Sequence, residues 1–189
     1  MIIDQLKKTV QIKIVFFGPA MSGKTKSLKK LFSFLGEQIY SIDNTMGRTL
    51  LFDYGTASVK NNQWNIKFHI YSTSGPDFYQ IMRCDVLKAV DGIIFVVDSQ
   101  KDVWKRNIDS WKELISFFGD QFESVPIVVA FNKQDLIGKL DVTEFLDKIG
   151  YRKYENIKIS YINSINGDGI LDAFEKMLKL VLGHVFIIA

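Results

Sequence analysis

The hydrophobic positions of the chain fall into short apolar runs that alternate with longer stripes of helical spacing. The short runs are rich in β-branched and aromatic residues and predict strands over residues 10–17, 49–59, 64–71, 92–97, 126–131 and 157–159. The runs at 92–97 and 126–131 are apolar at nearly every position, which is typical of strands buried on both faces. They therefore predict the centre of a parallel sheet.

The longer stripes predict the helices. Apolar residues three and four positions apart indicate helices over residues 24–35, 78–90, 103–118, 141–149 and 170–182. Strands that alternate with helices favour a doubly wound α/β fold with a mostly parallel, six-stranded sheet. Residues 49–59 are its one antiparallel edge strand, because a turn signal at Asn61 and Asn62 joins them to the next strand. The polar stretch 39–48 predicts a loop, and the whole chain, 1–189, is expected to form one domain.

A glycine-rich loop leaves the first predicted strand and opens the first helix. Residues 18–25 read Gly-Pro-Ala-Met-Ser-Gly-Lys-Thr and satisfy the phosphate-loop pattern G-x-x-x-x-G-K-S/T, which places the fold among the P-loop NTPases. Backbone N–H groups and the helix N-terminus of such a loop point at a phosphate chain. We expect Lys24 to contact the terminal phosphates and the Thr25 hydroxyl to coordinate Mg²⁺. The other residues predicted to bind nucleotide here are Gly18, Ser22, Gly23 and Lys26.

A second motif follows the strand 126–131 directly. Asn132, Lys133 and Asp135 form N-K-x-D at the carboxyl end of a parallel strand, where ligands bind in open α/β sheets. The Asp135 carboxylate can accept hydrogen bonds from guanine N1–H and from the 2-amino group, and adenine offers neither donor. Asn132 is expected to tie this loop to the phosphate loop, and Lys133 to lie along the base. The motif therefore predicts GTP and GDP as ligands.

The order of these motifs resembles that of the Ras-like small GTPases over about residues 10–183. The resemblance is closer to the MglA-type polarity GTPases of bacteria and archaea, which have segments similar in sequence to residues 48–54, 69–71 and 90–100. Residues 163–170 resemble the small-GTPase loop S-A-x-x-G-x-G-V/I. In that family the backbone N–H of the second residue, here Ser164, binds guanine O6, and Ile165 follows it in the same loop.

The chain departs from the family at the end of the third strand. Most small GTPases read D-x-x-G-Q there, whereas residues 72–76 read Ser-Thr-Ser-Gly-Pro. Ser72 can hydrogen-bond a magnesium-bound water but brings no charge. Gly75 remains, and its N–H senses the γ-phosphate in the family. Pro76 replaces the glutamine that orients the attacking water, so we expect slow hydrolysis.

The polar stretch before residue 50 holds further candidates. Thr49 is the preferred candidate for the threonine that meets Mg²⁺ and the γ-phosphate, with Thr45 as the alternative. Arg48 precedes it, as an arginine does in MglA-type proteins, where it acts as an internal arginine finger. A solvated loop cation is the competing interpretation of Arg48. The predicted catalytic set is Arg48, Lys24 and Gly75, and the predicted metal ligands are Thr25 and Thr49.

Asp98 ends the apolar run 92–97 and so looks like the Walker B carboxylate of an ATPase. In small GTPases of this pattern an aspartate here anchors a loop, and we prefer that role. A P-loop ATPase or kinase that uses Asp98 is a third hypothesis, which Asp135 argues against.

Composition narrows the functional class. The chain has 24 basic and 21 acidic residues, a net charge of +3, which predicts no nucleic-acid partner. A single cysteine, Cys84, excludes an internal disulfide and fits a cytoplasmic location. No apolar run approaches the roughly 18 residues of a membrane span. A C-terminus without cysteine and Ile2 in place of glycine predict no lipid anchor. The apolar residues 183–189 are expected either to pack back onto the domain or to contact a partner.

These patterns predict a GTP/GDP switch with slow intrinsic hydrolysis. The alternative is a GTP-binding module with little or no hydrolysis that acts as an interaction subunit, which Ser72 and Pro76 favour. Either would work with an effector or regulator protein, and the resemblance implies a regulator of the roadblock type.

Overall fold

The computed structural model describes residues 1–37, 39–45, 48–60, 63–73 and 80–186, and for 39–45, 48–51, 80–82 and 184–186 it describes the backbone alone. The strands are β1 (Ile2–Asp4), β2 (Thr9–Phe17), β3 (Ile39–Thr45), β4 (Arg48–Lys60), β5 (Asn65–Thr73), β6 (Gly92–Asp98), β7 (Ile127–Asn132) and β8 (Ile157–Tyr161). The α-helices are α1 (Lys24–Leu35), α2 (Gln80–Leu87), α3 (Trp104–Phe118), α4 (Val142–Lys148) and α5 (Ile170–Phe186).

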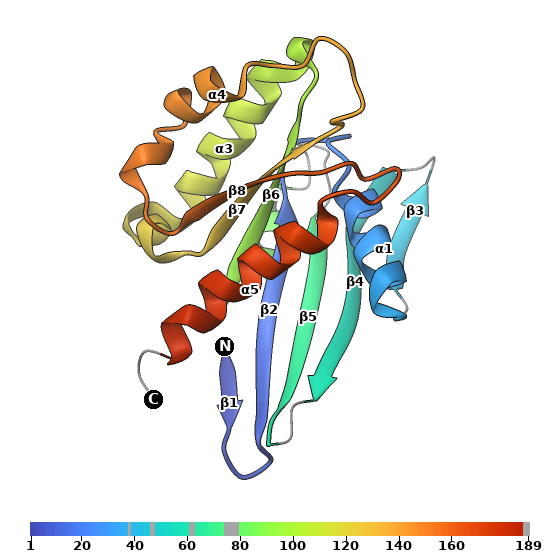
Figure 1. Ribbon diagram of the computed structural model, residues 1–189, viewed down its shortest axis with the longest axis vertical. Coiled ribbons are helices and arrows are strands. Elements are labelled where there is room, and N and C mark those ends of the chain that lie inside the picture. The colour runs from blue at the N-terminus through green and yellow to red at the C-terminus, as the bar shows by residue number, and fades with distance from the viewer. Residues whose placement is uncertain (38, 46–47, 61–62, 74–79, 187–189) are drawn as a thin grey trace.

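The strands form one mixed sheet in the order β3-β4-β5-β2-β6-β7-β8, with β1 paired to the start of β2 (Figure 1). Strands β5, β2, β6, β7 and β8 are parallel, whereas β4 is antiparallel to β5 and β3 to β4. The predicted doubly wound α/β fold is confirmed. The sheet has eight strands rather than six, because β1 and β3 were not expected.

Strand β3 corrects the prediction of a loop over residues 39–48. Residues 39–45 pair with β4, with Ile39 opposite Gly55 and Ile42 opposite Phe52. The sequence pattern missed this strand because backbone pairing at a sheet edge does not require an apolar side-chain face. Strand β1 was missed for a related reason, since its three residues are too few to show an alternation.

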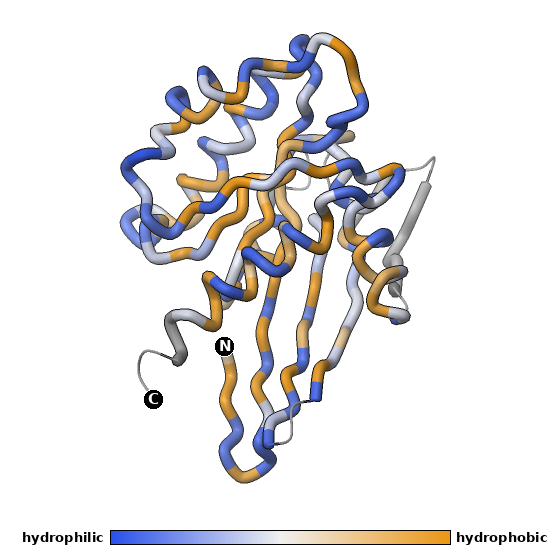
Figure 2. Tube along the Cα trace, viewed as in Figure 1, coloured by the Kyte–Doolittle hydropathy of each residue, from blue (hydrophilic) through white to orange (hydrophobic). Residues whose placement is uncertain are grey.

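Helices cover both faces of the sheet. Helices α1 and α5 cover one face of the sheet, where they bury strand residues such as Ile12, Ile14 and Phe68. Helices α2, α3 and α4 cover the other face, where they bury Val15, Phe17 and Phe95. Figure 2 shows many hydrophobic residues along the central strands, and hydrophobic and polar residues that alternate along the helices. Every residue of β6 and β7 is buried, as their sequences predicted. No helix in the described part of the chain is long and apolar enough to cross a membrane.

The strand directions decide where a ligand can bind. The carboxyl ends of β2, β6, β7 and β8 meet at one end of the sheet, and β1 with the hairpin ends of β4 and β5 projects from the opposite end (Figure 1). Loops that follow parallel strands at one edge form the binding crevice of open α/β sheets. Of the apolar tail, helix α5 includes residues up to Phe186, and residues 187–189 lie outside the description.

Candidate functional site

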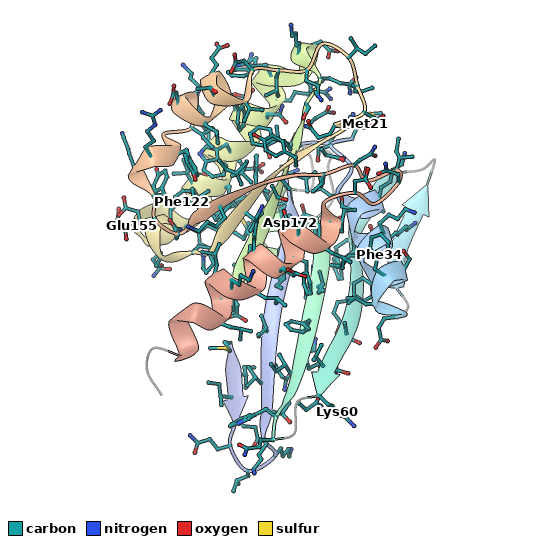
Figure 3. The ribbon with its side chains drawn as sticks, in the orientation of Figure 1. Met21, Phe34, Lys60, Phe122, Glu155 and Asp172 are labelled. Carbon is teal, nitrogen blue, oxygen red and sulfur yellow. The ribbon has the colours of Figure 1, made fainter. Side chains whose placement is uncertain are left out.

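The phosphate loop leaves β2 at Gly18 and becomes α1 at Lys24, and Figure 3 labels its exposed tip, Met21. Gly23 has φ +101, in the region that favours glycine. A Cβ at Gly23 would also overlap the Asn132 amide and lie 3.0 Å from the Ser164 hydroxyl. Glycine at this position therefore lets the loop approach the segments after β7 and β8.

Lys24 lies beneath the loop and is 5% exposed. Its Nζ donates hydrogen bonds to the carbonyl oxygens of Gly18 at 2.9 Å and Pro19 at 2.8 Å. Burial lowers the pKa of Lys24 to about 7, and the positive charge of Arg83 adds to this, while Glu113 and Asp53 partly offset it. The loop therefore holds an amine that an incoming anion would return to its charged form.

Thr25, the predicted magnesium ligand, donates its hydroxyl to Oδ2 of Asp53 at 2.7 Å. Asp53 lies on β4, is fully buried, and pairs across the sheet with Ser72 on β5. The Ser72 hydroxyl is also buried and has no hydrogen-bond partner within the described part of the chain. Ser72 stands at the position on β5 where most small GTPases have an aspartate. It therefore lies beside the carboxylate of Asp53 on β4.

Asp53 was not among the residues that the sequence predicted for the site. The sequence pattern that could have indicated Asp53 is the alternation along β4, where Asp53 shares a face with Gly55 and Ala57. Gly55 lies against Phe32 of α1, and Ala57 belongs to the core on the same side of the sheet. A carboxylate on the buried face of a strand needs a specific partner, because an unpaired buried charge is costly.

Asn132 joins three loops. Its Nδ2 donates to the Ser22 carbonyl at 2.6 Å and to the Ser164 hydroxyl at 3.0 Å, and its Oδ1 accepts the Ser164 N–H at 2.9 Å. The expected tie between Asn132 and the phosphate loop is thus present. The Ser164 N–H, predicted to bind guanine O6, donates to Asn132 in this structure, and the Ile165 N–H donates to Asn163 Oδ1 at 2.9 Å. Their contacts with the base stay predictions.

The remaining residues that were predicted to read the base differ in their surroundings. Lys133 Nζ lies 2.6 Å from Oδ2 of Asp98, whose other oxygen accepts from the Gln100 backbone and side chain. Asp98 thus holds the loops after β6 and β7, which supports the loop-anchor interpretation over a Walker B role. Asp135 is exposed, and no hydrogen bond to it is found among the described residues. It can therefore receive a ligand without breaking an existing contact.

Other predicted residues are less fully described. Arg48 and Thr49 begin β4, opposite Thr45 and Asn44 respectively, and only their backbone is described. Gly75 and Pro76 lie outside the described residues. Lys26 is exposed on the first turn of α1.

The described residues fit a nucleotide with a magnesium ion. The buried hydroxyls of Ser22 and Ser72 have no hydrogen-bond partner among the described residues. No group of three or more acidic, histidine or cysteine side chains suited to a metal is found in the described ranges. A magnesium ion that takes one threonine hydroxyl and phosphate oxygens does not need such a group.

Comparisons with known proteins agree with this geometry. The model of the ADP-ribosylation factor family matches residues 1–181. The chain is 30% identical over 188 residues to the mutual gliding-motility protein MglA of Myxococcus xanthus, covering 95% of each chain. It is 28% identical over 137 residues to an uncharacterized protein of Methanocaldococcus jannaschii, covering 72% of this chain and 79% of the relative. The chain therefore belongs to the Arf/Ras-like small GTPase family, whose members bind guanine nucleotides.

Proposed function

We propose that the chain is a GTP/GDP switch with slow intrinsic hydrolysis, built as one small-GTPase domain over residues 1–189. The observation that carries the proposal is the Asn132 side chain, which hydrogen-bonds the phosphate loop and the loop after β8 at once. This contact holds the phosphate-binding and base-reading segments at one end of the sheet. A ligand with a phosphate chain and a guanine base would span both segments.

The magnesium ion belongs to the same proposal. Thr25 would coordinate it together with phosphate oxygens, and Thr49 would join in the triphosphate state. Asp53 supports this assignment, because its carboxylate already lies 2.7 Å from the Thr25 hydroxyl and opposite Ser72. We propose that Asp53 supplies the negative charge that Ser72 lacks, by accepting hydrogen bonds from the Thr25 hydroxyl and from water near the ion.

Asp53→Asn is expected to reduce the dependence of GTP affinity on Mg²⁺. A charge-assisted hydrogen bond contributes about 1.5–3 kcal/mol, so affinity in Mg²⁺ should fall about tenfold or more, while affinity in EDTA changes much less. Asp172→Asn on α5 is the control for loss of an aspartate charge, since Asp172 accepts from the Ser160 hydroxyl at 2.6 Å and from Lys176 Nζ at 2.7 Å. Titration of a fluorescent GTP analogue with and without Mg²⁺ measures both values. An equal Mg²⁺ enhancement in Asp53→Asn and wild type would remove Asp53 from the metal site.

Nucleotide binding is expected to take up a proton. With a pKa of about 7, Lys24 of the free protein is mostly neutral at pH 8. Phosphate charges raise that pKa, so binding at pH 8 should take up about one proton per nucleotide. Calorimetry in HEPES and in Tris, which differ in ionisation enthalpy, measures this number. Identical binding enthalpies in the two buffers would mean that Lys24 is already charged before the nucleotide arrives.

Hydrolysis separates the proposed switch from a GTP-binding module that acts as an interaction subunit. Ser72 and Pro76 favour slow turnover, and single-turnover measurement with bound GTP decides between the two functions. A slow but measurable rate supports the switch. A rate that is undetectable, and stays so in Pro76→Gln, supports the interaction module.

The switch would act through other proteins. Segments that the γ-phosphate orders would present a surface to an effector. The relationship to MglA-type GTPases suggests a roadblock-type regulator, and the single cysteine suggests a cytoplasmic location. We propose no nucleic-acid partner.

A further inference from the structure

The ion pair between Lys133 and Asp98 has features that a simple loop anchor does not need. Lys133 has φ +65, a left-handed backbone conformation that is uncommon outside glycine. From that backbone its ammonium reaches Oδ2 of Asp98 at 2.6 Å. The Asp98 side chain is 2% exposed and that of Lys133 is 24% exposed. The carboxylate is therefore buried, while part of the lysine side chain stays open to the site.

Asp98 is itself held from a third element. The Asp98 N–H donates to Oδ1 of Asn107 at 3.0 Å, and Nδ2 of Asn107 donates to the Asp98 carbonyl at 2.8 Å. Asn107 is fully buried on α3. With both backbone groups fixed by one amide, Asp98 has little freedom to follow a moving lysine.

The two carboxylate oxygens of Asp98 have different partners. Oδ1 accepts from the Gln100 N–H at 3.2 Å and from its Nε2 at 3.1 Å. Oδ2 accepts from Lys133 and, at 3.3 Å, from the same Gln100 amide. Lys133 is the cation that this carboxylate meets in the described part of the chain, so the buried charge depends on it for neutralisation.

Neighbouring contacts hold the loop after β6 against the loop after β7. Gln134 Nε2 donates to the Ser99 hydroxyl at 3.1 Å, and the Leu140 N–H donates to the Ser99 carbonyl at 2.8 Å. The segment after β6 thus contacts the base-reading loop on both sides of Asp135. The ion pair is the charged contact within this set.

We infer that Asp98 is a positioning residue for guanine-nucleotide binding, which it serves by holding the Lys133 ammonium and so fixing the methylene stem beside the base. A free lysine side chain has rotamer entropy that a ligand would have to remove. Preorganisation by Asp98 removes that cost before the nucleotide arrives and slows nucleotide release. The inference rests on the proposed function. Because Asn107 on α3 fixes the backbone of Asp98, α3 contributes to the same positioning.

A double-mutant cycle tests the inference. Asp98→Asn, Lys133→Met and the double variant are compared for release of a fluorescent GDP analogue in Mg²⁺. Lys133→Met keeps the apolar stem and removes the charge. We expect Asp98→Asn to speed release about tenfold and to have little further effect in the Lys133→Met background. Independent effects that multiply in the double variant would overturn the inference.

Two controls separate positioning from damage to the fold. Inorganic triphosphate lacks a base, so its affinity should be the same for Asp98→Asn and wild type, and a matched loss would indicate a distorted phosphate loop. Gln100→Ala removes the side-chain amide that also contacts Asp98, keeps the backbone N–H that donates to it, and should leave release unchanged. If Asp98→Asn does not fold, Asp98→Glu keeps the charge but displaces the carboxylate, and should still speed release. If Asp98→Glu and Asp98→Asn both release the nucleotide at the wild-type rate, the inference is refuted and the proposed function is not. If the wild-type protein does not retain a guanine nucleotide, the proposed function is refuted.

Discussion

Asp135→Asn is expected to weaken GTP binding by at least about 2–3 kcal/mol, because the two charge-assisted hydrogen bonds to guanine are lost. The side chain is exposed and has no hydrogen bond among the described residues, so the substitution should not affect the free energy of unfolding. The same change replaces an acceptor with an amide donor. It should therefore shift preference toward xanthosine nucleotides, which carry a carbonyl in place of the 2-amino group.

Competition between GTP and xanthosine triphosphate for each protein measures the shift. Asp120→Asn is the matched control, since Asp120 is an exposed aspartate in the turn after α3, away from the site. It should bind both nucleotides as wild type does. Unchanged GTP affinity in Asp135→Asn would mean that the N-K-x-D segment does not read the base.

Arg48→Ala is expected to lower the rate of GTP hydrolysis much more than it lowers GTP affinity. In the internal-finger mechanism an arginine stabilises charge on the transferring phosphoryl group, and such an arginine contributes up to about 10³-fold or more. Only the backbone of Arg48 is described, at the start of β4, and the finger role is proposed from the resemblance of residues 48–54 to MglA-type proteins. Single turnover with saturating nucleotide measures the chemical step without a contribution from binding.

The control for this experiment is Arg106→Ala, which removes an exposed arginine on α3 and should leave the rate unchanged. Pro76→Gln tests the complementary part of the mechanism and should speed hydrolysis if the rest of the site is assembled. Equal rates for wild type and Arg48→Ala would make Arg48 a solvated loop residue.

The sequence predicted the parallel centre of the fold well, because β6 and β7 are apolar on both faces and burial there leaves little choice of structure. It also predicted the helices, since α3 and α5 carry long apolar stripes. The edge strand β3 could not be predicted in the same way. Its pairing with β4 depends on backbone hydrogen bonds, which leave no hydrophobic pattern.

Some residues of the candidate site could be predicted from the sequence, and others could not. Contiguous motifs pointed to Lys24, Thr25 and Asn132, because each residue belongs to a short pattern of fixed spacing. Asp53 was missed because its partner, Thr25, lies 28 residues away, and the strand order β4-β5-β2 with α1 packed on the sheet brings the two together. The contact between Asp98 and Lys133 spans 35 residues and likewise follows from strand order rather than from a local pattern.

Competition between GTP and ATP for the nucleotide-free wild-type protein in Mg²⁺ tests the central claim most directly. Asp135 offers an acceptor that matches guanine and leaves adenine without a partner, so ATP should bind roughly 10⁴-fold more weakly than GTP. GDP should compete with GTP, because the phosphate loop and the base-reading loops remain available to it. Equal affinity for ATP and GTP would contradict the assignment of this chain as a guanine-nucleotide switch.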